Sequence, residues 1–372
     1  MAAALADPSV FRDRAERVRK EMAAQGVDVL LLSVGHDLPY LTGYLAMPLE
    51  RLTMLVFPQD GPATMVVPRL EAPRVVEQPD VFDLRPWEET EDPVALVAGL
   101  VGTARHVAIG DQTWARFLVE LLPRLQGASF GRAADVVGPL RIRKDAAEIE
   151  ALRAAAAAAD RVAGQLQRGE IPLLGRTEAQ VSLELSRRLL AEGHDKINFA
   201  IVGSAANAAS PHHHASDRVI APGDIVLCDF GGTMNGYCSD ITRCVHLGEP
   251  PAEIVEAYAV LRQAQAKGVE AGLVGTQCQG VDRTTRKVIA DAGYGDYFIH
   301  RTGHGIGLEE HEDPYMVEGN DHPLEPGHAY SVEPGIYLPG RWGMRLEDIV
   351  VAAVEGPEPL NHADHSLIVL DA

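Results

Sequence analysis

The chain has 372 residues, of which 46% are hydrophobic and 23% are charged, an ordinary composition for a globular protein that argues against disordered and fibrous classes. Because single hydrophobic cores stop growing at roughly 250 to 300 residues, this length indicates two domains. The 53 acidic and 33 basic residues give a net charge of −20, which repels phosphate backbones and anionic lipid and argues against nucleic acid or membrane partners.

The N-terminal residues carry no pattern typical of export. The first ten, MAAALADPSV, contain no basic residue and reach Asp7 and Pro8 before an apolar stretch of signal-peptide length. The apolar run that begins at Val94 is about half the length needed to cross a bilayer. The four cysteines form no C-x-x-C pair and do not resemble a disulfide framework. We therefore expect a soluble protein of the reducing cytoplasm.

The first third of the chain predicts a small mixed α/β domain. Residues 8–26 place apolar side chains at helical spacing, and VDVLLLS at 27–33 has the composition of a buried strand. Helical stretches are expected around Val94 and Trp114. Further strands are predicted at LTMLVFP (52–58), ATMVVP (63–68) and HVAIG (106–110).

A change in residue composition near Arg141 indicates the domain boundary. A Gly-Pro turn and a cluster of basic residues precede a long alanine-rich helix that begins near Asp145. Thr177 and Gln180 have the spacing of a helix N-cap pair, which predicts a helix running toward Gly193. The expected domains are residues 1–140 and 141–372.

The second domain becomes rich in strands. Helices are predicted at 251–271 and 280–292, and strands at INFAIVG (197–203), DIVLCDFGG (224–232), YCSDITRCVHLG (237–248), AYSVEPGIYL (329–338) and MRLEDIVVA (344–352). Several of these strands contain acidic residues. A carboxylate in a buried strand costs several kcal/mol unless it is paired or bound to a metal ion, so each of these residues needs a partner.

Four carboxylates and one histidine are candidate metal ligands. Asp229 and Asp240 lie eleven positions apart on strands that a glycine-rich turn joins into a hairpin. His304 lies in TGHGIG, Glu333 precedes Pro-Gly, and Glu347 lies in RLED. Oxygen ligands with one imidazole suit Mn²⁺, Co²⁺ or Zn²⁺, and four carboxylates could neutralise two divalent ions.

In order along the chain, CDFGG, CSDITR, TGHGIG, VEPGIY and MRLEDI resemble the five-ligand signature of the creatinase/aminopeptidase (M24 metallopeptidase) superfamily. The chain is most similar there to Xaa-Pro dipeptidases (prolidases) and aminopeptidases P, which add a small N-terminal domain. The resemblance implies an α/β (α+β) fold in which a creatinase-like N-terminal domain precedes a C-terminal pita-bread catalytic domain. It also implies a homodimer and two divalent metal ions, for which we expect Mn²⁺.

The same resemblance implies roles for individual residues. Asp240 and Glu347 would bridge the two ions, Asp229 would bind one, and His304 with Glu333 would complete the other. Glu333 would also be the general base.

Three further histidines fall where this family places imidazoles on the substrate side, namely His212, His300 and His311. We prefer His212 to its neighbours His213 and His214 because it precedes Asp229 by seventeen residues, the family offset. Arg345 is placed either to orient the metal cluster or to meet the C-terminal carboxylate of a substrate.

The expected activity is hydrolysis of the bond between an N-terminal residue and proline, in dipeptides. Aminopeptidase P activity on longer Xaa-Pro peptides is the alternative within the family. From a different class, a non-catalytic peptide-binding module would typically have lost ligands, as would a metal-free, creatinase-like hydrolase, and all five are present here. Methionine aminopeptidases usually lack the N-terminal domain.

Three other patterns have simpler interpretations. GASFG, around Ser129, matches a serine-hydrolase elbow, but neither a strand before it nor a sufficiently long helix after it is expected. His300 and His304 have the spacing of a zincin helix, but the motif lacks its glutamate and is rich in glycine. Asp224 follows Pro-Gly and is expected to cap a turn.

Overall fold

The computed structural model describes residues 8–372 and divides into two compact units, Met1–Arg141 and Ile142–Ala372. The expected absence of an export signal rests partly on residues 1–7, which lie outside the described residues. No helix in the described part of the chain is both long and apolar enough to cross a membrane. All four cysteines are buried and free of disulfides.

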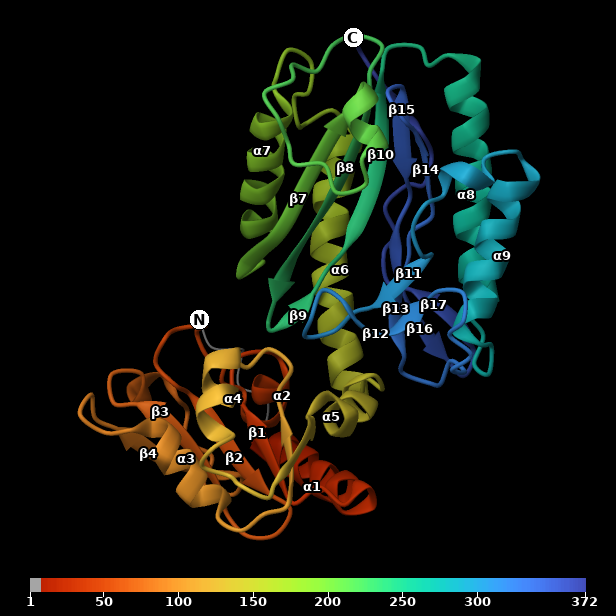
Figure 1. Cartoon of the computed structure of the whole chain (residues 1–372). Coiled ribbons are helices and arrows are strands. Elements are labelled where there is room, and N and C mark those ends of the chain that lie inside the picture. Colours follow the sequence, from red (N-terminus) through yellow and green to blue (C-terminus); the bar gives the residue numbers. More distant parts are fainter. Residues whose placement is uncertain (1–7) are drawn as a thin grey trace. The chain divides into compact units, whose positions relative to one another are not determined.

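The N-terminal unit is built on a six-stranded mixed sheet with the strand order β4-β3-β2-β1-β5-β6 (Figure 1). The strands predicted near 27–33, 52–58, 63–68 and 106–110 are confirmed. The strands are β1 (Val29–Leu32), β2 (Met54–Pro58), β3 (Ala63–Pro68), β4 (Phe82–Trp87), β5 (His106–Ile109) and β6 (Ser129–Arg132). The helices are α1 (Pro8–Gln25), α2 (Asp37–Thr42), α3 (Pro93–Val101), α4 (Ala115–Leu121) and α5 (Ala134–Arg141), with a 3-10 turn, η1 (Ala72–Arg74).

Helix α5 corrects the expectation of a Gly-Pro turn before Arg141. Pro139 lies inside this helix and has no N–H to donate to the carbonyl of Asp135. The side chain of Gln25 donates to that carbonyl instead, at 2.9 Å. Val136 and Val137 are buried, so packing and the substitute hydrogen bond hold a helix that the local sequence disfavours.

The serine-hydrolase pattern around Ser129 lies just before this helix. Ser129 begins β6, at the edge of the sheet, and its hydroxyl donates to the carbonyl of Arg105 at 3.2 Å. A helix does follow, contrary to expectation, but residues 129–132 form an extended strand and not a sharp strand-to-helix turn. The serine is therefore not presented as a nucleophile.

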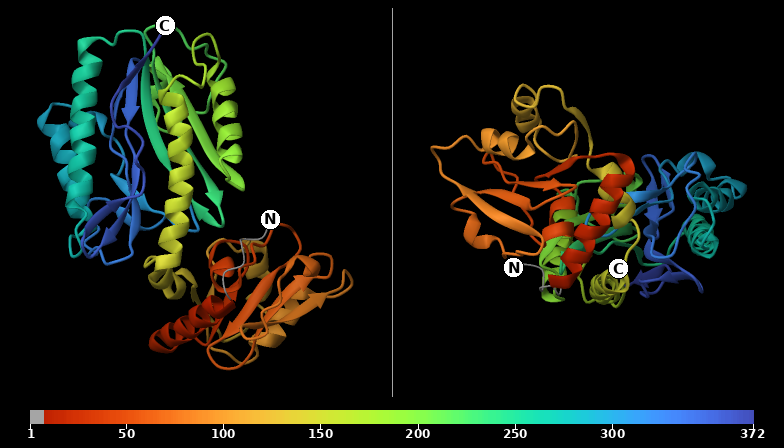
Figure 2. Two further views of the ribbon diagram at one scale, coloured as in Figure 1. Left: turned by 180° about the vertical axis from the view of Figure 1, so that it is seen from behind. Right: turned by 90° about the horizontal axis from the view of Figure 1, so that it is seen from below.

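The C-terminal unit contains two sheets covered by helices. One sheet has the order β18-β10-β8-β7, and the other has the order β12-β11-β13-β16-β17. Helix α6 runs across the first sheet beside α7, and α8 and α9 lie along the opposite side of the unit (Figures 1 and 2). Its helices are α6 (Ala146–Gln167), α7 (Glu178–Ala191), α8 (Ala252–Ala271) and α9 (Cys278–Asp291), with 3-10 turns η2 (Ala205–Ala209) and η3 (Gly295–Tyr297).

The strands of this unit are β7 (Lys196–Ser204), β8 (Ile225–Met234), β9 (Tyr237–Cys238), β10 (Ile241–Leu247), β11 (Gly303–Gly305), β12 (Glu312–Met316), β13 (Ala329–Val332), β14 (Gly335–Leu338), β15 (Trp342–Arg345), β16 (Asp348–Ala353), β17 (Gly356–Pro359) and β18 (Ile368–Leu370). Strand β9 pairs with β8, and β14 pairs with β15 to form a separate ribbon.

Both predicted helix starts in this unit are confirmed. Asp145 caps α6 and Thr177 caps α7, each in a capping box with the residue three positions later. Apolar side chains of α6 and α7 pack against Val226, Phe230 and Val245 of the first sheet. Helices α8 and α9 cover the other side, where they pack against side chains of the β14–β15 ribbon and of the second sheet. The helices therefore cover both sheets, which a backbone bridge between Thr242 and Glu347 connects.

Three predicted strands are interrupted, each at an acidic residue. The segment 237–248 is broken at Ser239 and Asp240, the segment 329–338 at Glu333 and Pro334, and the segment 344–352 before Asp348. In the last two cases the halves belong to different pairings, since β13 and β16 lie in the second sheet whereas β14 and β15 pair with each other. These two interruptions therefore lie where the chain passes between the sheet and the ribbon.

Candidate metal centre

A tight hairpin brings Asp229 and Asp240 together. Asn235 and Gly236 turn with positive φ, and β10 then pairs with β8 so that Thr242 lies opposite Asp229. At Gly231 any Cβ atom would lie 2.1 Å from the backbone oxygen of Ser239. Only glycine therefore allows the segment before Asp240 to approach β8 this closely.

The other three predicted ligands come from the second sheet and its ribbon. His304 is the central residue of β11, and a Cβ at Gly303 would lie 1.8 Å from the carbonyl oxygen of Ser331 on β13. Glu333 follows β13 directly, and its N–H donates to the carbonyl of Thr302 at 2.8 Å. Since His304 lies in a strand, the expectation that no zincin helix forms here is confirmed.

Glu347 joins the two halves of the centre. It forms an isolated backbone bridge with Thr242 on β10, and its carboxylate accepts the hydroxyl of Thr242 at 2.7 Å. One ligand atom each of Asp240, His304 and Glu347 lie within 4.8 Å of one another. The Nε2 atom of His304 is 3.7 Å from Asp240 and 3.4 Å from Glu333.

The protonation pattern of His304 suits a ligand. Its Nδ1 lies 3.0 Å from the carbonyl oxygen of Gly305, which can only accept, so Nδ1 carries the proton. The lone pair of Nε2 consequently faces the carboxylates of Asp240 and Glu333. A histidine fixed in this way by a backbone carbonyl is a common arrangement in metal sites.

Unsatisfied oxygens show that these residues need a cation. The Oδ1 atoms of Asp229 and Asp240 are buried and have no hydrogen-bond partner among residues 8–372. Burial, followed by the charges of neighbouring carboxylates, raises the pKa of Asp240 and of Glu347 far above their usual values. Burial likewise raises the pKa of Glu333 to about 7. The donor set therefore fits divalent metal ions, which would occupy the space between mutually repelling carboxylates.

Arg345 is buried, and several protein groups bind its guanidinium. It is 3% exposed and forms an ion pair with Asp229. It also donates to the hydroxyl of Tyr337 at 2.8 Å and to that of Thr242 at 3.1 Å. A further contact reaches the carbonyl of Pro211 at 3.3 Å. In this geometry Arg345 orients Asp229 and is held by three further protein groups.

His300 is also held by neighbours on both ring nitrogens. Its Nε2 lies 2.9 Å from the hydroxyl of Tyr337, which already accepts from Arg345 and therefore donates to the ring. Its Nδ1 donates to the carbonyl of Arg301 at 2.7 Å. Burial lowers the pKa of His300 to about 3, so the ring is neutral. In this structure His300 orients the hydroxyl of Tyr337, and both of its ring nitrogens already form hydrogen bonds within the protein.

His311 and His212 lie on the open side of the centre. The ring of His311 is 3.9 Å from that of His304, and both His311 and His212 are exposed. The charge of His212 is among the causes that lower the pKa of His311, after burial and Arg301, which places the two imidazoles near each other. His213 instead faces away and bonds the buried carboxylate of Glu178 at 2.8 Å.

The structure also places Asp224 outside the centre, as expected. Its carboxylate pairs with Arg218 at 2.6 Å and accepts the N–H of Ala221 at 2.9 Å, which caps the turn.

Three residues beside the centre were not predicted, namely Thr242, Tyr337 and Arg301. Thr242 could have been found from the sequence, because it lies two residues after Asp240 and so on the same strand face. The positions of Tyr337 and Arg301 depend on how β14 and β11 pack, which no local pattern encodes.

A second group of possible ligands, His322, Glu325 and His328, lies apart from the predicted one. Here the N–H of Glu325 donates to Nδ1 of His328 at 3.3 Å, so the proton of the neutral ring is on Nε2. Arg143 pairs with the carboxylate of Glu325 at 2.6 Å. Both features disfavour a cation at this position.

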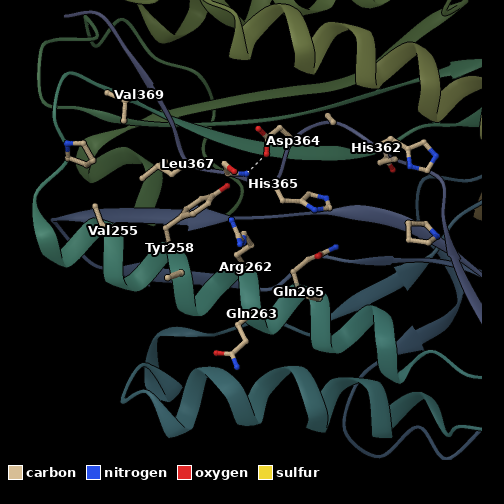
Figure 3. Close-up of a pocket in the computed structure, with 17 residues that line it drawn as sticks. Val255, Tyr258, Arg262, Gln263, Gln265, His362, Asp364, His365, Leu367 and Val369 are labelled. Carbon is tan, nitrogen blue, oxygen red and sulfur yellow. Dashed lines mark hydrogen bonds between the residues drawn. The ribbon is translucent and has the colours of Figure 1, made fainter.

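A groove of about 1150 Å³ lies between α8 and the C-terminal segment and contains none of the predicted site residues (Figure 3). Tyr258, Arg262 and Gln265 project from α8 toward the segment that carries His365 and Leu367. The side chains of Gln265 and His365 bond the carboxylate of Asp348 at 2.8 and 2.7 Å. The groove is therefore close to Asp348, the residue that follows the predicted ligand Glu347.

Comparison with known proteins identifies both units. The family model described as "Metallopeptidase family M24" matches residues 149–353, and that described as "Creatinase/Prolidase N-terminal domain" matches residues 14–143. The predicted fold class is thereby confirmed.

Individual relatives cover nearly the whole chain. The "Probable dipeptidase PepE" of Mycobacterium tuberculosis is 42% identical over 98% of each chain. Among solved structures, a prolidase from Thermococcus sibiricus has a TM-score of 0.93 at 33% identity, covering 99% of this chain and 100% of its own. An Xaa-Pro dipeptidase from Bacillus anthracis has a TM-score of 0.88 at 32% identity, with 97% and 100% covered.

Proposed function

The chain belongs to metallopeptidase family M24, and from this premise we propose that it hydrolyses the peptide bond between an N-terminal residue and proline, with dipeptides as its substrates. The family assignment confirms the predicted resemblance and the prediction of a metallopeptidase. The main structural support for the proposal is the group formed by Asp240, His304 and Glu347, near which one oxygen each of Asp229 and Asp240 has no partner among residues 8–372. The relatives described above are a probable dipeptidase and two prolidase-type enzymes, and their names support the choice of substrate.

Family membership implies divalent metal ions, and the finer assignment is part of the proposal. Two ions, for which we propose Mn²⁺ before Co²⁺ or Zn²⁺, would be held by Asp229, Asp240, His304, Glu333 and Glu347. Bound ions of this kind lower the pKa of water toward neutrality and polarise a carbonyl oxygen. The unsatisfied oxygens of Asp229 and Asp240 and the free lone pair of His304 support this ligand set.

The remaining residues would position the substrate and move protons. Glu333 lies at the edge of the cluster and is the proposed general base, which accepts a proton at its carboxylate and later delivers it to the departing proline nitrogen. His212 and His311 would donate hydrogen bonds to the carbonyl oxygen as it gains charge. His300 and Arg345 belong to the site as positioning residues, because their donors and acceptors are already used within the protein.

Two alternatives remain distinct from this proposal. Aminopeptidase P activity would extend to tripeptides such as Ala-Pro-Ala, whereas the proposed dipeptidase would cleave Ala-Pro much faster. A non-catalytic peptide-binding module would bind Xaa-Pro peptides without cleaving them, and the presence of all five proposed ligand residues in the sequence argues against it.

The proposal includes a domain division at 140/141, a cytoplasmic location and a homodimer. The compact units and the extents of the two family matches support the division. Four reduced, buried cysteines are compatible with the cytoplasm. Light scattering of the purified protein would test the homodimer, for which the family resemblance is the support.

The decisive experiment is a substrate series. The purified enzyme, freed of metal with a chelator and reloaded with Mn²⁺, Co²⁺ or Zn²⁺, is assayed on Ala-Pro, Ala-Pro-Ala and Ala-Ala. We expect cleavage of Ala-Pro only after metal is restored. Absence of cleavage of every Xaa-Pro peptide with all three metals would refute the proposal.

A further inference from the structure

A dipeptide carries a free carboxylate one residue from the bond that is broken, and Arg345 cannot receive it. The donors of Arg345 are committed to Asp229, Tyr337, Thr242 and the backbone at Pro211. Breaking any of these contacts would leave a buried polar group without a partner, which costs about 1 to 3 kcal/mol. A different cation must therefore meet the substrate carboxylate.

Arg286 is also disfavoured, because protein groups already hold its guanidinium. It pairs with Asp282 at 3.1 Å and donates to the carbonyls of Phe298 and His300 at 2.8 and 2.7 Å. It therefore supports the backbone before β11 and cannot turn toward a ligand.

Arg301 differs from both of these arginines. In the part of the chain that the structure describes, its guanidinium has neither a carboxylate partner nor a hydrogen bond, and its side chain is half-buried. Its guanidinium lies over the ring of Tyr315, whose centroid is 4.3 Å from the guanidinium carbon. A cation held flat over an aromatic face keeps its N–H edges free to form a bidentate bond with a carboxylate.

The backbone places this arginine next to the metal centre. Arg301 precedes Thr302, whose N–H donates to Met316 on β12 at 3.0 Å and whose carbonyl accepts the N–H of Glu333 at 2.8 Å. The charge of Arg301 is one of the causes that lower the pKa of His311, after burial, and it also acts on Glu333. Arg301 therefore lies on the side of the centre where His311 is exposed.

We propose that Arg301, held against the ring of Tyr315, is the binding site for the free C-terminal carboxylate of the dipeptide. One residue spans at most about 3.6 Å, so a carboxylate one residue beyond the scissile carbonyl remains close to the β11–β12 hairpin while that carbonyl lies at the His304 cluster. Longer peptides and amides present a neutral group to the same guanidinium and lose the charge-assisted bond. Arg301 would thus make the enzyme a dipeptidase and not an aminopeptidase.

This inference rests on the proposed function, and the test separates the two. Kinetics of the Mn²⁺-loaded enzyme are compared on Ala-Pro and on Ala-Pro-amide, which differ only in the terminal charge. The wild type should have a KM for Ala-Pro at least about tenfold below that for the amide. If the wild type cleaves neither, the proposed function fails; if it cleaves both with equal KM, the carboxylate site fails while the function stands.

The variant Arg301→Gln should raise KM for Ala-Pro about 10- to 100-fold, with kcat and the amide kinetics close to wild type. Product inhibition gives a second measurement, since proline but not prolinamide should inhibit the wild type, and Arg301→Gln should lose that difference. An equal loss on acid and amide, or no loss at all, would overturn the inference.

Two further variants control for folding and for the geometry of the positive charge. Arg283→Gln removes an exposed arginine paired with Glu318 on the surface and should behave as wild type. Arg301→Lys keeps the charge but not the fork geometry and should recover part of the preference for the acid, whereas a purely structural Arg301 would show no such selective recovery.

Discussion

Thr242 and Glu347 lie 105 positions apart in the chain, yet the hydroxyl of Thr242 donates to the carboxylate of Glu347 at 2.7 Å and their backbones form a bridge. This contact connects β10 of the first sheet to the chain between β15 and β16. The same hydroxyl accepts from Arg345 at 3.1 Å. One side chain therefore orients both a proposed ligand and the arginine that holds another, Asp229.

Replacing Thr242 with valine tests this arrangement, since valine has a similar shape but no hydroxyl. Glu347 and Arg345 would each lose a partner, and we expect metal affinity or activity to fall about 10- to 100-fold. Titration of the metal-free variant with Mn²⁺ measures the affinity directly. Thr242→Ser keeps a hydroxyl and should retain most of the Mn²⁺ affinity. Equal Mn²⁺ affinity in the valine variant and the wild type would contradict the role of this hydroxyl in orienting Glu347 and Arg345.

Asp240→Ala should remove metal binding together with activity, because Asp240 lies at the middle of the cluster. For the wild type, adding Mn²⁺ at about 100 times its dissociation constant to the metal-free protein should stabilise it by about 2.7 kcal/mol and raise Tm by about 5 to 10 °C. The variant should fold and show no such rise. As a control, Asp224→Ala breaks the pair with Arg218 and should lower Tm while keeping the Mn²⁺ response.

His212 and His213 should give opposite results when each is changed to alanine. His212→Ala should lower kcat about 100-fold with full metal occupancy, as for the loss of a positioned donor. His213→Ala removes a bond to the buried Glu178 and should instead lower the free energy of unfolding by about 1 to 3 kcal/mol. Full activity of the His212 variant would show that His212 has no part in catalysis.

Glu178 predicts a pH dependence of stability away from the metal centre. Despite burial, hydrogen bonds from Ser204, Ser216 and His213 lower its pKa to about 2, against an ordinary value of 4.5. Because the pKa of the folded state is depressed, its stabilisation is present above about pH 4.5 and is lost as the pH falls through about 2. Glu178→Gln should therefore lower the free energy of unfolding by about 2 to 3 kcal/mol at pH 7, and by little near pH 2.

Urea unfolding at a series of pH values measures this effect. Glu184→Gln is the matched control, since arginine pairs also lower the pKa of Glu184 to about 2 but at the surface of α7. Salt and solvent screen such pairs, so this variant should change the free energy of unfolding by less than about 1 kcal/mol. An equal loss in both variants would contradict the role assigned to burial.

The sequence alone was sufficient to propose the five candidate ligands and a boundary near Arg141, and to identify most of the helices and strands. These features are local, because capping boxes, apolar periodicity and short motifs around Asp229, His304 and Glu347 each occupy a few adjacent residues. The hairpin that joins Asp229 to Asp240 also followed from its turn residues, Asn235 and Gly236.

Only the tertiary structure decided how the surrounding side chains are used. It showed strands interrupted at Asp240, Glu333 and Glu347. At Glu333 and Glu347 the chain leaves one strand pairing for another, and such long-range pairing leaves no periodic signal in the sequence. It likewise separated Arg345, which is buried and held by several protein groups, from Arg301, whose guanidinium lies over Tyr315 and has no hydrogen bond to residues 8–372. Two arginines of identical chemistry thus differ in role because burial and neighbours, and not residue type, determine which hydrogen bonds remain available.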